Sequence, residues 1–215
     1  MKNIIHTLCV LFLLGFNACN TNTPVLPYAY ETNPQYTKVL EEFYGAYYSN
    51  YNCKNNVLTL SLFTKDLGLD EQNQLVGLGQ CLVFTDVFIH PKDTILPEGT
   101  YNLAETKEPF TFFGGKEFKE KGAISGIPSG AYICYVEADP SKNKIKYITE
   151  GSFTVSIQNK EYTIHCNFKT DDKKELKGTF KGAFYFTDVS KKVKARAISF
   201  HTPFPVPTQP IQSVF

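Results

Sequence analysis

Three consecutive segments in the second half of the chain alternate apolar and polar side chains, and this alternation constrains the fold more than any other feature. The segments are 153–158, 162–169 and 176–186, separated by Asn159-Lys160 and by Asp171–Lys174. Because successive side chains of a strand point to opposite faces, each segment predicts a strand with one apolar face. Together they predict an antiparallel sheet that is covered on one side. The residues expected in the core include Ile157, Ile164, Phe180 and Phe184.

The apolar face of such a sheet needs a second layer, and the first half of the chain offers one. Residues 57–64 alternate in the same way, and 18 Phe and 13 Tyr with no Trp are typical of strands. The tetrapeptide Phe84–Val87 recurs as Phe186–Val189, which indicates two halves of similar build, with a chance match as the alternative. We therefore expect a single all-β domain over residues 36–200, an antiparallel β-sandwich of two sheets. A closed up-and-down barrel, similar to a lipocalin, is the alternative.

Residues 1–18 have the features of a secretory signal peptide. A short basic start precedes the mostly apolar residues 4–15, a run too short for a membrane-spanning helix, which needs ~20 residues. Residues 14–19 resemble the lipobox of bacterial lipoproteins, in which the cysteine thiol is acylated and becomes the new N-terminus. We expect lipidation at Cys19, because acyl chains anchor a domain without a transmembrane helix. An ordinary signal peptide that ends beside a cysteine is the alternative.

Residues 19–35 are rich in Asn, Thr and Pro and predict a lipidated tether between the membrane and the domain. The outer membrane is the expected location. No acidic residue stands between Cys19 and Glu31, which leaves the face of that membrane open and slightly favours the periplasmic side. Residues 193–200 could add an edge strand, and residues 201–215 predict a proline-rich extended tail.

The charge of the chain argues against nucleic acid as a partner. The formal net charge is +1, and it falls to zero when the leader takes Lys2 with it. A neutral domain with the single arginine Arg196 is poorly suited to hold a phosphate backbone.

Four cysteines follow Cys19 and show no CxxC spacing: Cys53, Cys81, Cys134 and Cys166. An exported compartment permits disulfides, and four cysteines allow three pairings. The last three lie within strand-like runs, where cysteine is commonly buried as a small apolar residue. We favour buried free thiols, and disulfides are the alternative.

Residues that could carry catalysis are few. His90, His165 and His201 have no second His or Cys at metal-ligand spacing, so no metal and no cofactor are expected. His165 falls on the polar face of its strand and is expected in solvent. Asp86 and Asp188, in the repeated tetrapeptide, could form the carboxylate pair that glycoside hydrolysis requires. Turn residues at strand ends are the explanation that we favour for both.

Tyrosines are concentrated near the start of the domain. Residues 28–51 contain seven of the thirteen tyrosines. Exposed tyrosines stack on sugars and anchor protein partners at a low entropic cost, although burial of about half of them in the core is the alternative. The ligand-binding residues proposed from this concentration are Tyr44, Tyr47, Tyr48 and Tyr51.

Several short motifs occur in the same order as in an uncharacterised group of small all-β lipoproteins from gut Bacteroidetes, and the chain resembles that group over residues 40–189. The motifs are Phe43–Gly45, Leu58–Leu60, Leu96–Tyr101, Gly151–Val155, Tyr162–Ile164 and Leu176–Phe180. They are strand and turn signals, so the resemblance implies a fold and no catalytic residue.

The resemblance also bears on residues 35–48, whose apolar spacing fits a helix that would begin at Asn33-Pro34. In the group this segment resembles the first strand, and Gly45 also favours a strand, which we expect here.

From these observations we expect a membrane-anchored envelope lipoprotein that acts as a non-enzymatic binding or accessory module for glycan or protein. A glycan-active hydrolase and a purely structural envelope component are the alternatives.

Overall fold

The computed structural model describes residues 28–71, 74–119 and 126–191, and the protein is all-β, as predicted. The segments predicted as signal peptide and C-terminal tail, the possible edge strand 193–200 and Cys19 lie outside these residues. The strands are β1 (Gln35–Gly45), β2 (Asn56–Thr64), β3 (Leu67–Leu69), β4 (Leu75–Gly77), β5 (Gly79–Ile89), β6 (Gly99–Leu103), β7 (Thr111–Phe112), β8 (Lys116–Phe118), β9 (Ile127–Ser129), β10 (Ala131–Val136), β11 (Lys144–Gln158), β12 (Glu161–Thr170), β13 (Glu175–Leu176), β14 (Thr179–Gly182) and β15 (Tyr185–Asp188). Two short 3-10 helices accompany them, η1 (Ser49–Tyr51) and η2 (Pro140–Lys142).

Seven of the described strands pair in a closed ring. In chain order β1, β2, β5, β10, β11, β12 and β14 each pair antiparallel with the next. The ring closes because β14 pairs with β1, and this last pair is parallel. An odd number of alternating strands requires that result, since the first and the last then run in the same direction.

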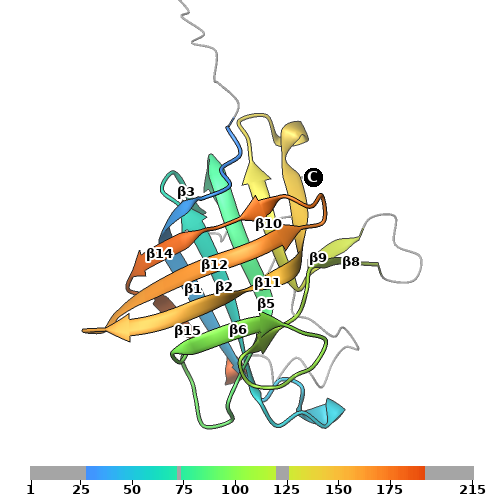
Figure 1. Ribbon diagram of the computed structural model, residues 1–215, viewed down its shortest axis with the longest axis vertical. Helices are drawn as coiled ribbons and strands as arrows, with labels where there is room; N and C mark the ends of the chain where they lie inside the picture. Colours follow the sequence, from blue (N-terminus) through green and yellow to red (C-terminus); the bar gives the residue numbers. More distant parts are fainter. Residues whose placement is uncertain (1–27, 72–73, 120–125, 192–215) are drawn as a thin grey trace, which may run out of the picture.

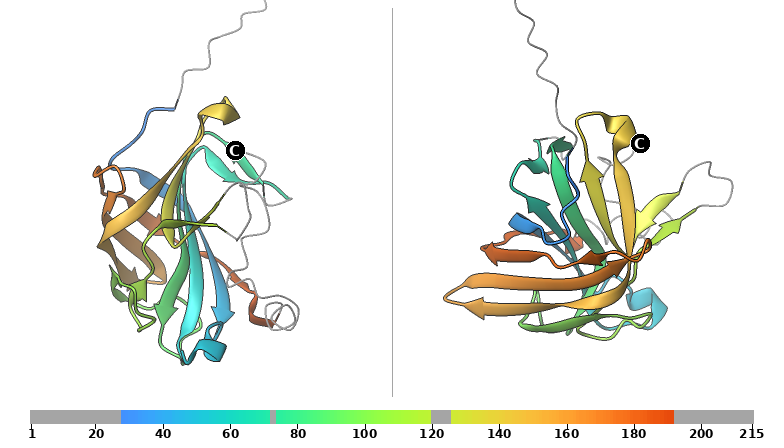
Figure 2. Two further views of the ribbon diagram at one scale, coloured as in Figure 1. Left: turned by 90° about the vertical axis from the view of Figure 1, so that its right-hand side faces the viewer. Right: turned by 45° about the horizontal axis from the view of Figure 1, so that its top comes forward.

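The closed ring has features of both the predicted sandwich and the barrel that was its alternative. Figure 2 shows β1, β2 and β5 as one wall and β11, β12 and β14 as the opposite wall, and Figure 1 shows the strands of the two walls crossing at a large angle. The two layers of the sandwich are thus present, but hydrogen bonds join them on both sides. This connectivity is that of the closed up-and-down barrel, with β6, β7, β13 and β15 as additions.

The predicted hairpin at Asn159-Lys160 is confirmed. Both residues have positive φ, 53° and 68°, as in the two-residue turns that match the twist of paired strands. Ile164 and Phe180 lie directly opposite each other and are buried in the barrel interior, as predicted. Ile157 and Phe184 are only partly buried and pack against the same core from its margin.

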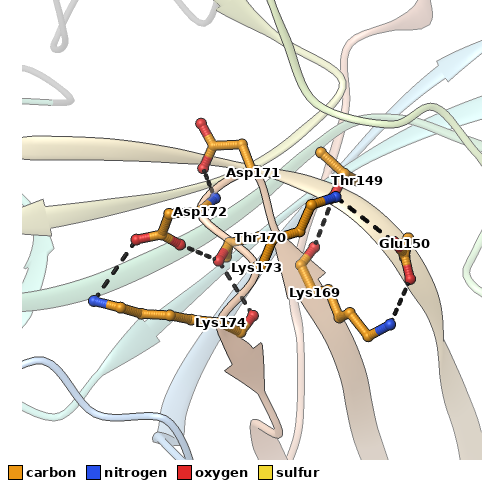
Figure 3. Close-up of polar contacts among 8 residues, drawn as sticks. All are labelled: Thr149, Glu150, Lys169, Thr170, Asp171, Asp172, Lys173 and Lys174. Carbon is orange, nitrogen blue, oxygen red and sulfur yellow. Dashed lines mark hydrogen bonds and ion pairs between the residues drawn. The ribbon is translucent and has the colours of Figure 1, made fainter.

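The second predicted turn, Asp171–Lys174, is also present and is held by its own polar groups (Figure 3). The buried Thr170 hydroxyl donates to Asp172 at 2.6 Å, and the Asp172 carboxylate pairs with Lys146 and Lys174 at 3.2 and 3.7 Å.

The prediction of one continuous strand over residues 176–186 is wrong. The segment is divided into β13, β14 and β15, and β15 pairs with β1 and no longer with β12. The chain leaves β12 in order to close the ring, so Phe186 is exposed and not in the core. Phe84–Val87 lies inside β5 whereas Phe186–Asp188 is an exposed edge strand, so the repeated tetrapeptide does not mark two equivalent halves.

The outer face of one wall is buried as well. The β3–β4 hairpin covers a cluster on β5 and β10, and a second cluster lies against the segment between β1 and β2. As a result β5 is buried on both faces over nearly its whole length. This covering of the outer face explains why Cys81 and Cys134, which are paired across β5 and β10, are both buried. All four described cysteines are buried free thiols, as favoured from the sequence.

The start of the domain combines a confirmed prediction with a correction. Residues 35–45 form the expected strand and not a helix. The strand begins at Gln35, and the residues just before it lie against the barrel and are not part of a free tether. The fully buried Gln80 side chain explains this, because its amide accepts from Glu31 N and Tyr28 Oη and donates to Glu31 O.

One carboxyl group is enclosed in the barrel interior. Glu41 lies on β1 between Val39 and Phe43, is 1% exposed and accepts a hydrogen bond from Leu96 N at 2.8 Å. Burial raises the pKa of Glu41 from 4.5 to about 7, against the opposing effect of that hydrogen bond.

We predict that Glu41→Gln stabilises the protein above neutral pH. A pKa raised in the folded state contributes stability that is present below pH 4.5 and lost as the pH rises through about 7. The free-energy difference between variant and wild type should therefore grow over this window to about 3 kcal/mol. Urea unfolding at pH 5 and pH 8 measures it, with the exposed Glu108→Gln as control. A difference that is the same at both pH values would contradict the prediction.

Candidate functional site

The four predicted tyrosines lie together where β1 ends and the chain turns toward β2. Gly45 and Asn52 have positive φ, 64° and 58°, and bracket the turn that contains η1. Tyr47 N donates to Gly45 O at 2.8 Å, and Tyr51 N donates to Tyr48 O at 2.9 Å. We call the four side chains the tyrosine cluster: Tyr44, Tyr47, Tyr48 and Tyr51.

The rings of the tyrosine cluster form a chain of edge-to-face contacts. The centroids of Tyr44 and Tyr47 are 6.2 Å apart, those of Tyr47 and Tyr48 5.0 Å, and those of Tyr48 and Tyr51 6.2 Å. Their interplanar angles of 65–87° are those that aromatic pairs prefer. The structure thus brings together all four residues that the sequence proposed.

Only half of the tyrosine cluster can meet a partner. Tyr44 and Tyr48 are buried, whereas Tyr47 is half-buried and Tyr51 is 64% exposed. The proposal of Tyr44 and Tyr48 as surface ligand residues is therefore wrong, because both pack with Phe88 and Cys53 in the outer cluster. They instead form a buried layer beneath Tyr47 and Tyr51.

Asp86 holds this buried layer of Tyr44 and Tyr48 in place through the Tyr48 hydroxyl. Its carboxylate accepts from the Tyr48 hydroxyl and from Thr85 Oγ1, both at 2.6 Å, and Asp86 is 2% exposed. Thr85 Oγ1 in turn accepts from Gly130 N at 2.9 Å. The acid therefore links the tyrosine cluster to β5 and to the start of β10.

The expectation that Asp86 is a turn residue is wrong, and a β-bulge is the reason. Leu58 pairs with Val87 and Leu60 with Phe84, so Thr85 and Asp86 together lie opposite one residue of β2. A bulge re-aims side chains within a strand. Here Phe84 and Val87 both keep their places in the interior, while Asp86 reaches the Tyr48 hydroxyl.

Opposing effects act on the pKa of the Asp86 carboxyl. Burial raises the pKa of the Asp86 carboxyl, while the hydrogen bonds from Thr85 and Tyr48 and the charge of Lys107 act in the opposite direction. Burial and the Asp86 charge raise the pKa of the Tyr48 hydroxyl, so it remains a donor. Lys107 Nζ lies 5.5 Å from the Tyr48 ring centroid, a cation–π distance.

Asp188 lies in different surroundings. It is exposed at the end of β15, where its carboxylate accepts from Ser190 N and Ser190 Oγ at 2.9 and 2.7 Å. This is the strand-end role that the sequence suggested for it. One acid is thus buried within a strand and the other is a surface cap, so the structure gives the two no shared environment.

Two of the three histidines, His90 and His165, lie within the described residues. His165 is exposed on β12, and His201 lies outside the described residues. Within residues 28–71, 74–119 and 126–191, no group of three or more His, Cys, Asp or Glu side chains is placed to hold a metal ion. None of the helices in this part of the chain is long and apolar enough to cross a membrane.

Comparison with protein-family models, with curated proteins and with solved structures gives no match. The resemblance to small Bacteroidetes lipoproteins stays a hypothesis.

Sequence reasoning missed the hydrogen bond between Tyr48 and Asp86 and the position of Lys107 over the Tyr48 ring. The two partners are 38 residues apart, and their contact depends on the bulge. A bulge leaves no distinct signal in the alternation of a strand that is buried on both faces.

We predict that Asp86→Ala lowers the free energy of unfolding by about 1–3 kcal/mol, because the Tyr48 hydroxyl then loses its acceptor in a buried site. Asp188→Ala is the matched control and should change stability by no more than about 0.5 kcal/mol, as expected for a surface position. Urea unfolding measures both. Equal losses in the two variants would show that the buried bond contributes nothing specific.

Proposed function

We propose that this chain is an envelope lipoprotein, anchored to the outer membrane through Cys19, whose domain is a non-enzymatic binding module for a glycan or protein. The observation that carries the binding proposal is the pair Tyr47 and Tyr51, presented to solvent on a base of buried rings. The leader and the Cys19 motif in the sequence support the anchor.

A rigid aromatic pair suits recognition. Tyr47 packs on Tyr44 and Tyr48, and Tyr51 packs on Tyr48, so little side-chain freedom remains to be lost on binding. The exposed ring area of Tyr51 and of the half-buried Tyr47 offers a partner aromatic contact. Lys107 adds a positive charge beside Tyr48 and Phe113. Such a surface can stack on a sugar ring or contact an acidic, aromatic protein surface.

The hydrolase alternative gains nothing from the acid pair that prompted it. Glycoside hydrolysis needs two carboxyl groups that flank one scissile bond. Asp86 is occupied by Tyr48 and Thr85 inside the protein, and Asp188 caps Ser190 at the surface. The structural alternative predicts that no ligand binds the tyrosine cluster.

We predict that Tyr51→Ala together with Tyr47→Ala weakens binding of a captured partner by more than about tenfold, equivalent to about 1.4 kcal/mol. Parallel pull-downs on glycan arrays and on solubilised envelope proteins identify the class of partner. Titration of the purified protein then gives the Kd. Tyr185→Ala is the control, since Tyr185 is 70% exposed on β15 and outside the cluster. Unchanged affinity in the double variant would remove the tyrosine cluster from the proposal.

We predict that Cys19 carries the lipid. Cys19→Ala should move the protein from the membrane fraction to the soluble envelope fraction, because acyl chains supply the anchor. Mass spectrometry of the wild-type N-terminus checks the acylation directly. An unmodified N-terminus that begins at another residue would contradict this part of the proposal and leave the binding module untouched.

A further inference from the structure

Three buried tyrosine hydroxyls gather at the opposite end of β1 from the tyrosine cluster. They belong to Tyr30, Tyr36 and Tyr135, and none has a hydrogen-bond partner among the described residues. Tyr36 is the second residue of β1 and is 3% exposed, and Tyr135 lies on β10 and is 5% exposed. Tyr30 precedes the barrel in sequence and is partly buried.

The three side chains are neighbours. Tyr36 and Tyr135 belong to the interior core of the barrel, and Tyr30 packs against that core. The Tyr30 ring meets Tyr135 edge-on, with centroids 4.7 Å apart at an interplanar angle of 61°. Burial, together with the neighbouring Tyr30 and Tyr36, raises the pKa of the Tyr135 hydroxyl, so it stays protonated and able to donate. The Tyr30 and Tyr135 hydroxyls approach each other closely enough to contribute to this raised pKa, but neither they nor the Tyr36 hydroxyl has a partner at full hydrogen-bond geometry.

An unpartnered buried hydroxyl is unusual in this protein. Tyr48, Tyr101 and Tyr28 each donate to an acceptor at 2.6–3.0 Å. A buried polar group without a partner is costly, and native structures contain few of them. Three in one place, each from a different segment, indicate a site whose hydrogen bonds are completed by another molecule.

A short segment covers this end of the barrel. Residues 28–31 reach β5 through Gln80 and reach the end of β10 through Tyr28 N, which donates to Glu137 at 2.6 Å. Figure 1 shows this start of the described chain beside the loop that joins β10 to β11. On its other side Lys174 Nζ lies 5.3 Å from the Tyr30 ring centroid, on the turn shown in Figure 3. Tyr30 is the part of this covering segment that enters the core.

We propose that the space occupied by the Tyr30 ring is a ligand site for an oxygenated aromatic ring, which displaces Tyr30 and accepts hydrogen bonds from the Tyr36 and Tyr135 hydroxyls. The covering segment is then a replaceable plug: it fills the site with a ring of the right size but leaves the hydroxyls there without acceptors.

The surroundings favour an aromatic ring over a sugar. The site offers aromatic neighbours and only two or three hydroxyls, and small-molecule sites of this kind combine apolar walls with a few polar groups. A sugar ring would bring more hydroxyls than the site can pair, and each unpaired one would oppose binding. A ring with one carboxylate or carbonyl group matches the donors that Tyr36 and Tyr135 present.

The test uses the purified full chain with benzoate and benzamide as probes, and with benzylamine as a ring that lacks an acceptor. Both acceptor probes should raise the Tm in a concentration-dependent way, and benzylamine should not. Tyr30→Ala should bind benzoate at least about tenfold more tightly, because the plug is gone. Tyr185→Ala is the control for loss of a tyrosine elsewhere and should leave benzoate binding unchanged, since Tyr185 is exposed on β15 and lies outside both sites.

The hydroxyls themselves are tested with Tyr36→Phe and Tyr135→Phe. Without probe these variants should keep or raise the Tm, because they remove groups that have no partner, and they should bind benzoate at least about tenfold more weakly. Tyr101→Phe is the matched control and should lower the Tm, since the Tyr101 hydroxyl donates to Pro97 O at 3.0 Å.

Two outcomes would overturn the proposal. If the two Phe variants lose stability and no probe binds the wild type, the hydroxyls serve a buried water or one another. If benzoate protects the Phe variants as well as the wild type, it binds elsewhere. Because the site and the tyrosine cluster lie at opposite ends of β1, neither outcome affects the function proposed for Tyr47 and Tyr51.

Discussion

The parallel pairing of β14 with β1 is the contact on which the arrangement of this domain depends. It joins Gln35 and Tyr36 to Thr179 and Phe180, which lie at opposite ends of the described chain. Without this pairing β1 and β14 would both be edges, and exposed edges are open to pairing with other chains. The contact is short, and β1 extends it by taking β15 as a second parallel partner farther along. β15 pairs along β1 beyond β14, and its aromatic residues Tyr185 and Phe186 are exposed.

A second constraint is the burial of both faces of β5. An ordinary barrel strand presents one face to the interior and one to water, but the outer face of β5 is covered by the β3–β4 hairpin and by the turn after β1. A carboxylate on that face cannot be solvated, so it needs partners, and the bulge at Thr85-Asp86 directs it to the Tyr48 hydroxyl. The rigidity of the tyrosine cluster is therefore a consequence of how β5 is covered.

The part of the structure that could be predicted consists of strands with one face toward the core and the other toward solvent. The alternation in residues 153–169 predicted β11, β12 and the turn between them, because a period of two has a single interpretation when one side faces water. The same reasoning failed at Phe186, because closure of the ring is a long-range event that local alternation does not encode. It failed again at Asp86, since a strand buried on both faces shows no alternation from which a bulge could be detected. The grouping of the four tyrosines was predicted, but their division into buried and exposed pairs depends on Phe88 and Cys53 from other segments.

The two ends of β1 differ in how completely their polar groups are satisfied, and this difference separates their roles. At the Tyr44 end, the Tyr44 and Tyr48 hydroxyls donate to carboxylates of Glu42 and Asp86, so the buried layer is fixed and only the exposed rings remain for recognition. At the Tyr36 end, aromatic packing is present, but the hydroxyls of Tyr30, Tyr36 and Tyr135 have no hydrogen-bond partner among the described residues. A site with satisfied donors gains little from rearrangement, whereas one with unsatisfied donors gains from any guest that supplies acceptors. The first end is therefore suited to contact with a large surface, and the second to uptake of a small molecule.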